Sequence, residues 1–154
     1  MRITRIALVL AGAVLFLSSS ASRAQMTVTN TATLDFGTLA PSGVAGTVVI
    51  APAGGRTTTG GVAGVSGTFG PGAFKVAITS GGSSFFFFLP ANATLSSGGN
   101  TMTIGTLTSN PTSPGTVPGP PGNVVVYVGA TLSVGANQAA GTYTGTYSIL
   151  FIHF

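Results

Sequence analysis

The sequence predicts an all-β protein, an antiparallel immunoglobulin-like β-sandwich of about seven or eight strands. Three observations support this fold class. Thr, Val, Phe, Tyr and Ile are abundant, whereas the helix formers Glu, Gln and Lys are nearly absent. Apolar residues alternate with polar or small residues in several short segments. Clusters drawn from 24 Gly and 9 Pro residues separate those segments, as turns between strands would.

The first 24 residues have the pattern of a cleaved signal peptide. Arg2 and Arg5 precede the uncharged run 6–17, and small residues follow it. We expect cleavage before Gln25. A membrane anchor is the alternative, but this apolar run is shorter than the roughly 20 residues that span a bilayer. The pattern predicts export to the periplasm, the cell surface or the medium, with membrane contact only through the cleaved segment.

Residues 25–154 are long enough for a single domain with its own core. The proline-rich stretch 109–123 is interpreted as a long loop between strands. The predicted strands, in chain order, are 26–33, 47–51, 73–78, 85–89, 101–107, 126–134 and a long final strand through 143–151.

Alternation is clearest in three of these strands. In 73–78, the residues Phe74, Val76 and Ile78 form one apolar row. The strand 126–134 has the longest such row. In the final strand, the apolar side chains that share one face are Tyr143, Tyr147, Ile149 and Phe151.

Two stretches are apolar on both faces. The run of four Phe residues at 85–88 indicates either a central strand covered on both sides or an outer row of rings reserved for a partner, and we favour the partner. In the last strand, Leu150, Ile152 and Phe154 add an apolar row opposite the core row, which invites pairing with another strand. The predicted assembly surface comprises Phe86, Phe88, Tyr143, Tyr147, Ile149, Phe151, His153 and Phe154.

The ionisable residues argue against catalysis and nucleic-acid binding. After residue 24 the chain contains no Glu and no Cys, and Asp35, Arg56, Lys75 and His153 each stand alone in the sequence. A pair of catalytic carboxylates cannot be assembled, and two isolated cations cannot bind a phosphate backbone. Asp35 is expected to order the turn that follows it. We therefore expect no enzyme activity, cofactor, metal site, small-molecule substrate or nucleic-acid partner.

Four strings carry a resemblance to a known family. They are LDFGTL at 34–39, GTVVI at 46–50, VGATL at 128–132 and AGTYTGTYS at 140–148. Together they resemble the bacterial secreted family called domain of unknown function 4402, over almost all of residues 25–154. The resemblance implies an immunoglobulin-like secreted sandwich.

The C-terminal segment is also similar to the subunits of chaperone-usher pili and spore-coat-like fimbriae. Those chains end in an alternating apolar strand, with a Gly fourteenth from the end and a penultimate aromatic residue. Gly141 occupies the first position here, and His153 stands where a Tyr is expected. The resemblance implies a sandwich that is open along its last strand and is completed by an extended segment of the next subunit.

Residues 26–34 are the candidate donor of such a strand. Met26, Val28, Ala32 and Leu34 alternate in this segment, although Asn30 interrupts the apolar row. The segment either donates a strand or belongs to its own sandwich, and the sequence leaves both open.

The function expected from the sequence is that of a secreted, non-enzymatic structural or surface protein, fimbria-like, with its own copies or a fimbrial partner joined by strand pairing. One alternative is a small outer-membrane β-barrel, although eight spanning strands would leave few residues for the Gly- and Pro-rich loops. The other alternative is a carbohydrate or surface adhesion module, favoured by the Thr-rich exterior but not by the scarcity of acids.

Overall fold

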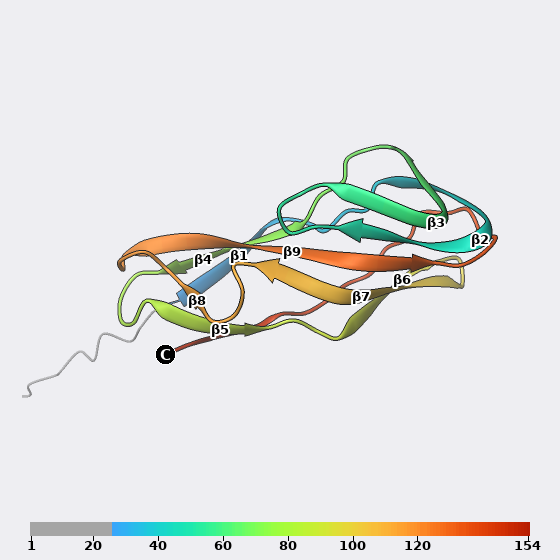
Figure 1. Cartoon of the computed structure of the whole chain (residues 1–154). Helices are drawn as coiled ribbons and strands as arrows, with labels where there is room; N and C mark the ends of the chain where they lie inside the picture. The colour runs from blue at the N-terminus through green and yellow to red at the C-terminus, as the bar shows by residue number, and fades with distance from the viewer. Residues whose placement is uncertain (1–25) are drawn as a thin grey trace, which may run out of the picture.

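The computed structural model describes residues 26–154, so the predicted signal peptide and the predicted cleavage site lie outside the described residues. The described part of the chain consists of ten strands and no helix (Figure 1). The strands are β1 (Met26–Ala32), β2 (Thr38–Ile50), β3 (Arg56–Ser66), β4 (Gly72–Ile78), β5 (Ser84–Phe88), β6 (Asn92–Ser97), β7 (Asn100–Asn110), β8 (Gly115–Thr116), β9 (Gly122–Val134) and β10 (Leu150–His153).

The long strand β9 organises a seven-stranded antiparallel sheet. β4 pairs with its first part, β2 pairs with its second part, and β7 pairs with residues 127–133 of β9. Because β7 overlaps both partners in register, β4 and β2 lie one after the other along the opposite edge of β9. β1, β3 and β6 extend the sheet beyond β4, β2 and β7.

A second sheet of three strands, in the order β10-β5-β8, forms the other layer of the sandwich over one half of the molecule (Figure 1). All-β composition and antiparallel pairing confirm the predicted fold class. The alternation predicted for 126–134 is also confirmed, because Val126, Val128, Ala130, Leu132 and Val134 are all buried.

The apolar row of β9 runs through two cores. Its first part packs with Val76, Ile78, Phe85 and Phe87 between the two sheets. Its second part packs with residues of β2, β3 and β7, and with half-buried residues of β6. Strands β3 and β6 lie at opposite margins of that half, yet residues of both pack against the same core. The large sheet therefore curls around this core, and the three-stranded sheet does not cover it.

The observed strands correct three predictions. β3, β6 and the short β8 were not expected, because few of their residues are buried and no apolar row marks them. β8 interrupts the stretch interpreted as a long loop. The final strand is much shorter than predicted, since its ladder begins only at Leu150, and a single bridge from Thr144 to Ser96 holds the preceding segment.

The N-terminal segment is part of its own sandwich in this structure. Residues of β1 from Met26 to Ala32 pair with β4, with an irregularity after Asn30. Six of the seven residues in β1 are nevertheless exposed. The strand is held by its backbone ladder and contributes little to the core.

Candidate functional site

An open groove with a volume of about 780 Å³ lies on the curled half of the molecule. Its walls are two chain segments from opposite ends of the sequence, residues 33–39 and residues 138–147. Side chains of the first core form the floor, and these are Leu95, Met102, Ile104, Leu132 and Val134. Leu95 is half-buried and the other four side chains of the floor are buried, so the groove lies directly over packed core residues.

The N-terminal wall is fixed by hydrogen bonds on its outer side. The backbone N–H of Gly37 donates to the Asp35 carboxylate at 2.8 Å, as expected for a turn ordered by Asp35. The backbones of Asp35 and Gly70 exchange two hydrogen bonds of 2.9 Å. The Arg56 guanidinium donates to the carbonyl of Phe36 at 3.0 Å and lies 4.5 Å from the centre of the Phe69 ring. These contacts hold the wall against β3.

The C-terminal wall follows β6. Thr144 and Ser96 exchange backbone hydrogen bonds of 2.8 and 3.1 Å. The Tyr143 hydroxyl donates to the carbonyl of Ala139 at 2.8 Å and accepts from the Gln138 side chain at 2.8 Å. Gly145 lies against the carbonyl oxygen of Thr94, at a distance that leaves no room for a Cβ atom.

This wall presents a second backbone edge to the groove. In an extended segment, successive N–H and C=O groups point to opposite sides. Thr144 directs its groups toward β6, so the groups of Tyr143 and Gly145 point the other way. A row of backbone donors and acceptors beside an apolar floor is what an added β-strand requires.

The second core is also open along the end of the chain. Tyr147, Ile149 and Phe151 pack against it but stay half-buried. Phe74 makes an edge-on contact with Tyr147, with ring centres 6.2 Å apart, and lies 6.1 Å from Phe151. Burial raises the pKa of the Tyr147 phenol above its ordinary value of 10.0. Among the described strands, β10 pairs only with β5, and no described strand pairs with its other edge.

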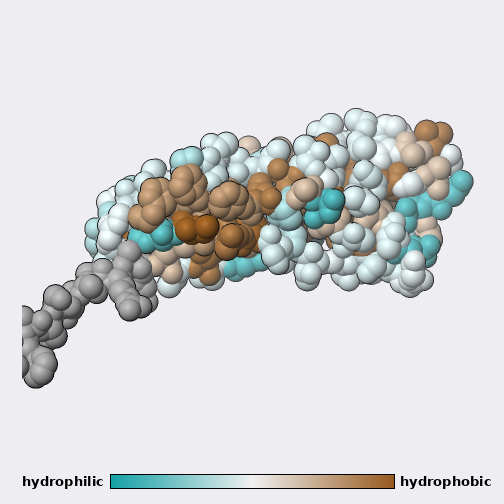
Figure 2. Space-filling view, turned by 90° about the horizontal axis from the view of Figure 1, so that it is seen from below, coloured by the Kyte–Doolittle hydropathy of each residue, from teal (hydrophilic) through white to brown (hydrophobic). Residues whose placement is uncertain are grey.

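The outer surface of the three-stranded sheet carries a separate apolar patch, which we call the aromatic face. It comprises Phe86, Phe88, Leu150, Ile152 and Phe154, all of which are exposed. In β5 the intervening Phe85 and Phe87 are buried. Figure 2 shows the patch as a continuous brown area on one half of the molecule.

The predicted assembly residues therefore fall into three groups. Phe86, Phe88 and Phe154 lie on the aromatic face, Tyr143 lies in the wall of the open groove, and Tyr147, Ile149 and Phe151 cover the second core. His153 ends β10, and its Nε2 atom lies 2.7 Å from the carbonyl of Gly82.

Sequence reasoning missed the N-terminal wall and the floor of the open groove. Residues 33–39, β6 and β7 are far apart in sequence, and they meet only because the large sheet curls. The LDFGTL string marked the wall as part of a family pattern but gave no sign of a groove. Leu150 and Ile152 were recognised as an apolar row, yet they were not placed in the predicted assembly surface.

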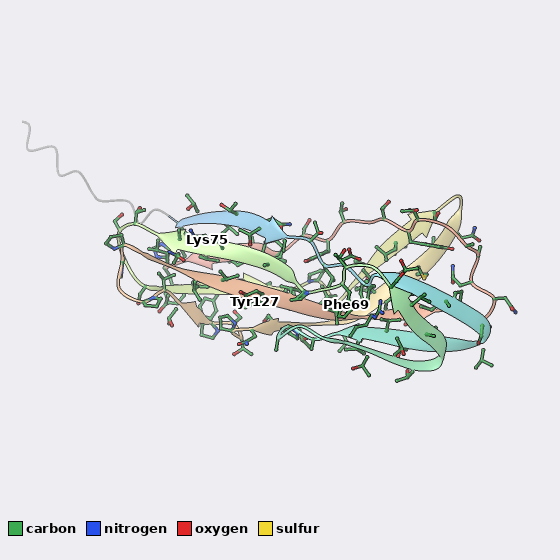
Figure 3. The ribbon with its side chains drawn as sticks, turned by 90° about the horizontal axis from the view of Figure 1, so that it is seen from above. Phe69, Lys75 and Tyr127 are labelled. Carbon is green, nitrogen blue, oxygen red and sulfur yellow. The ribbon has the colours of Figure 1, made fainter. Side chains whose placement is uncertain are left out.

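Asp35, Gln138 and Tyr143 line the open groove, whereas the other polar side chains described next lie away from both surfaces. Lys75 on β4 and Tyr127 on β9 project from the outer surface of the large sheet, with Phe69 nearby in the loop before β4 (Figure 3). Within residues 26–154, no three His, Asp or Glu side chains gather closely enough to hold a metal ion. No helix in the same residues has the length and apolar character needed to cross a bilayer.

Comparison with known proteins gave one match. A protein-family model described as a domain of unknown function, DUF4402, covers residues 9–152. No curated protein and no solved structure matches the chain.

Proposed function

The chain belongs to the DUF4402 family, and from this premise we propose that it is an exported, fimbria-like structural subunit whose open groove accepts a β-strand from a second copy. The leader-like pattern of residues 1–24 supports the exported location. The groove supports the mode of assembly. The chemistry at work is backbone hydrogen bonding and apolar burial, without bond-making side chains.

The single observation that carries the proposal is the open groove that lies against the first core. Met102, Ile104, Leu132 and Val134 belong to that core and also line the groove. An incoming strand would pair with the backbone at Tyr143 and Gly145 and would place alternate side chains on this floor. Each large apolar side chain buried there contributes about 1.5 kcal/mol or more.

The donor in this proposal is β1 of the second copy. Its ladder with β4 can be exchanged for a ladder in the groove, and its exposed side chains mean that little apolar contact is lost on release. Val28, which is 38% exposed in its own copy, would become buried. At about 3.3 Å per residue, the seven residues of β1 reach roughly 23 Å, enough to enter a neighbouring molecule.

Low charge supports assembly. The described residues carry one Asp, one Lys and one Arg, so the repulsion that keeps copies apart is weak. The same scarcity supports a non-enzymatic role, because general acid–base chemistry needs paired titratable groups.

The test is to express the full chain and examine the exported protein by electron microscopy and sedimentation velocity. We expect filaments or long oligomers. Ala93→Phe fills the groove from β6 and should abolish them, and Thr142→Trp should do the same from the C-terminal wall. Ala63→Phe, the same change on the exposed surface of β3, is the matched control. Monomers from the unaltered chain, or filaments from both groove variants, would overturn the proposal.

A further inference from the structure

The aromatic face is an exception among the outer surfaces of this protein. In an antiparallel sandwich the outward row of each strand is normally polar. β9 follows this rule with Thr131 and Ser133, and β7 follows it with Thr101 and Thr103. Only the outward rows of β5 and β10 are continuously large and apolar among the described strands. Phe85 and Phe87 already fill the core beneath, so folding does not require these outer side chains.

The five side chains of the aromatic face form a flat, regular array. In the register of the two strands, Phe88 lies beside Leu150, and Phe86 lies beside Ile152. Phe154 continues the row of β10, and its ring stacks on Phe86 with centres 4.8 Å apart and planes at 23°. An array of this kind has the shape to pack against another sheet face, at about 10 Å between sheets.

We infer that the aromatic face packs against the same face of a second copy, related by a two-fold axis, and so joins copies side by side. The exposed apolar area of the aromatic face supports a second copy as its partner. The exposed fractions are 40% for Phe86, 55% for Phe88, 59% for Leu150, 44% for Ile152 and 59% for Phe154. At roughly 200 Å² for each fully exposed side chain, two such faces together bury about 1,000 Å², which reaches the size of a specific interface.

The charge distribution supports contact between like faces. In a two-fold contact residue i of one copy meets residue j of the other and j meets i, so charges near the axis would face their own copies and repel. The aromatic face contains no ionisable side chain. Lys75 lies on β4 of the large sheet (Figure 3), not on the three-stranded sheet, and the His153 ring lies 2.7 Å from the carbonyl of Gly82. This packing of sheet faces is independent of strand addition at the open groove.

The experiment measures self-association by sedimentation equilibrium in the Ala93→Phe background, where strand addition is blocked. We expect a monomer–dimer equilibrium whose dissociation constant rises by about 100-fold or more in the double variant Phe88→Ser with Ile152→Ser. The double variant Val44→Ser with Val65→Ser removes equally exposed side chains, 64% and 61%, from the far half of the molecule and should leave the constant unchanged.

Cross-linking locates the contact. The chain contains no Cys, so Phe86→Cys introduces a unique thiol near the centre of the aromatic face. A bifunctional thiol reagent of about 10 Å should link two copies at this position and not at Val65→Cys. Urea unfolding confirms that the variants are folded. A monomer at every concentration, unchanged dimers in the Phe88→Ser with Ile152→Ser variant, or binding of phosphatidylcholine vesicles without dimers would overturn the inference.

Discussion

The carbonyl oxygen of Thr94 lies so close to Gly145 that a Cβ atom at position 145 would clash with it. A glycine at this position therefore allows the C-terminal segment to approach β6. This contact sets one wall of the open groove. We predict that Gly145→Ala lowers the free energy of unfolding by about 1–3 kcal/mol, because the segment must move away from β6. Urea denaturation measures the change. Gly105→Ala, at a strand position with open space around the added atom, is the control, and an equal loss there would contradict the argument.

The four-Phe strand offers a matched pair of neighbours. Phe87 is 3% exposed and packs on Phe85 and Phe151, whereas Phe88 is on the aromatic face. Phe87→Ala should lower the free energy of unfolding by about 3–5 kcal/mol, because it opens a cavity in the second core. Phe88→Ala should change it by less than about 1 kcal/mol. Thermal unfolding of dilute samples tests the pair, and similar losses would mean that the outer ring supports the fold.

Arg56 is expected to stabilise the N-terminal wall of the groove. Its guanidinium donates to the Phe36 carbonyl and stacks on Phe69. Arg56→Ala should cost about 1–2 kcal/mol of unfolding free energy through the loss of these two contacts. Hydrogen exchange at residues 35–39 should accelerate with it. Lys75→Ala, which removes an exposed cation on β4, should leave both measurements unchanged, and an effect of the same size there would contradict a local role.

The Tyr147 phenol predicts alkaline destabilisation. Its pKa is raised in the folded state, so below pH 10 folded and unfolded chains both hold the proton. As the pH rises through 10, the unfolded chain releases its proton first, and stability falls until the folded pKa is passed. The test measures the urea concentration at the unfolding midpoint for the unaltered chain and for Tyr147→Phe. The pH is varied from roughly 9 to 12, a range that brackets the ordinary tyrosine pKa. Identical slopes in the two proteins would contradict it.

The fold was predictable where alternation is strong. The rows of β4 and β9 are visible in the sequence because their inward apolar residues have a core to fill, whereas in the four-Phe run of β5 only Phe85 and Phe87 are buried. β3 and β6 carry few such residues, since they form the margins of the curled sheet, and Thr- and Gly-rich margins look like loops. The predicted apolar row of the final strand does face the two cores, and its members are Tyr143, Tyr147, Ile149 and Phe151. The sequence pattern could not show that most of this segment has no neighbouring strand to pair with.

The open groove could not be predicted for a physical reason. It forms where residues 33–39, β6 and residues 138–147 come together, and that meeting depends on the curvature of the whole sheet. The two outer apolar rows, in contrast, follow from strand period alone. Side-chain alternation does not show which molecule binds these outer apolar rows.

Strand exchange between copies is tested most directly by a mixed cross-link. One preparation carries Thr29→Cys, which alternates with the inward-facing Val28 in β1, and a second, isotopically labelled preparation carries Thr144→Cys on the exposed side of the groove wall; the native chain has no thiol. The two are mixed, assembled, oxidised and analysed by mass spectrometry. Strand addition predicts a disulfide joining residue 29 of one copy to residue 144 of the other. Assemblies without that mixed disulfide would contradict the account.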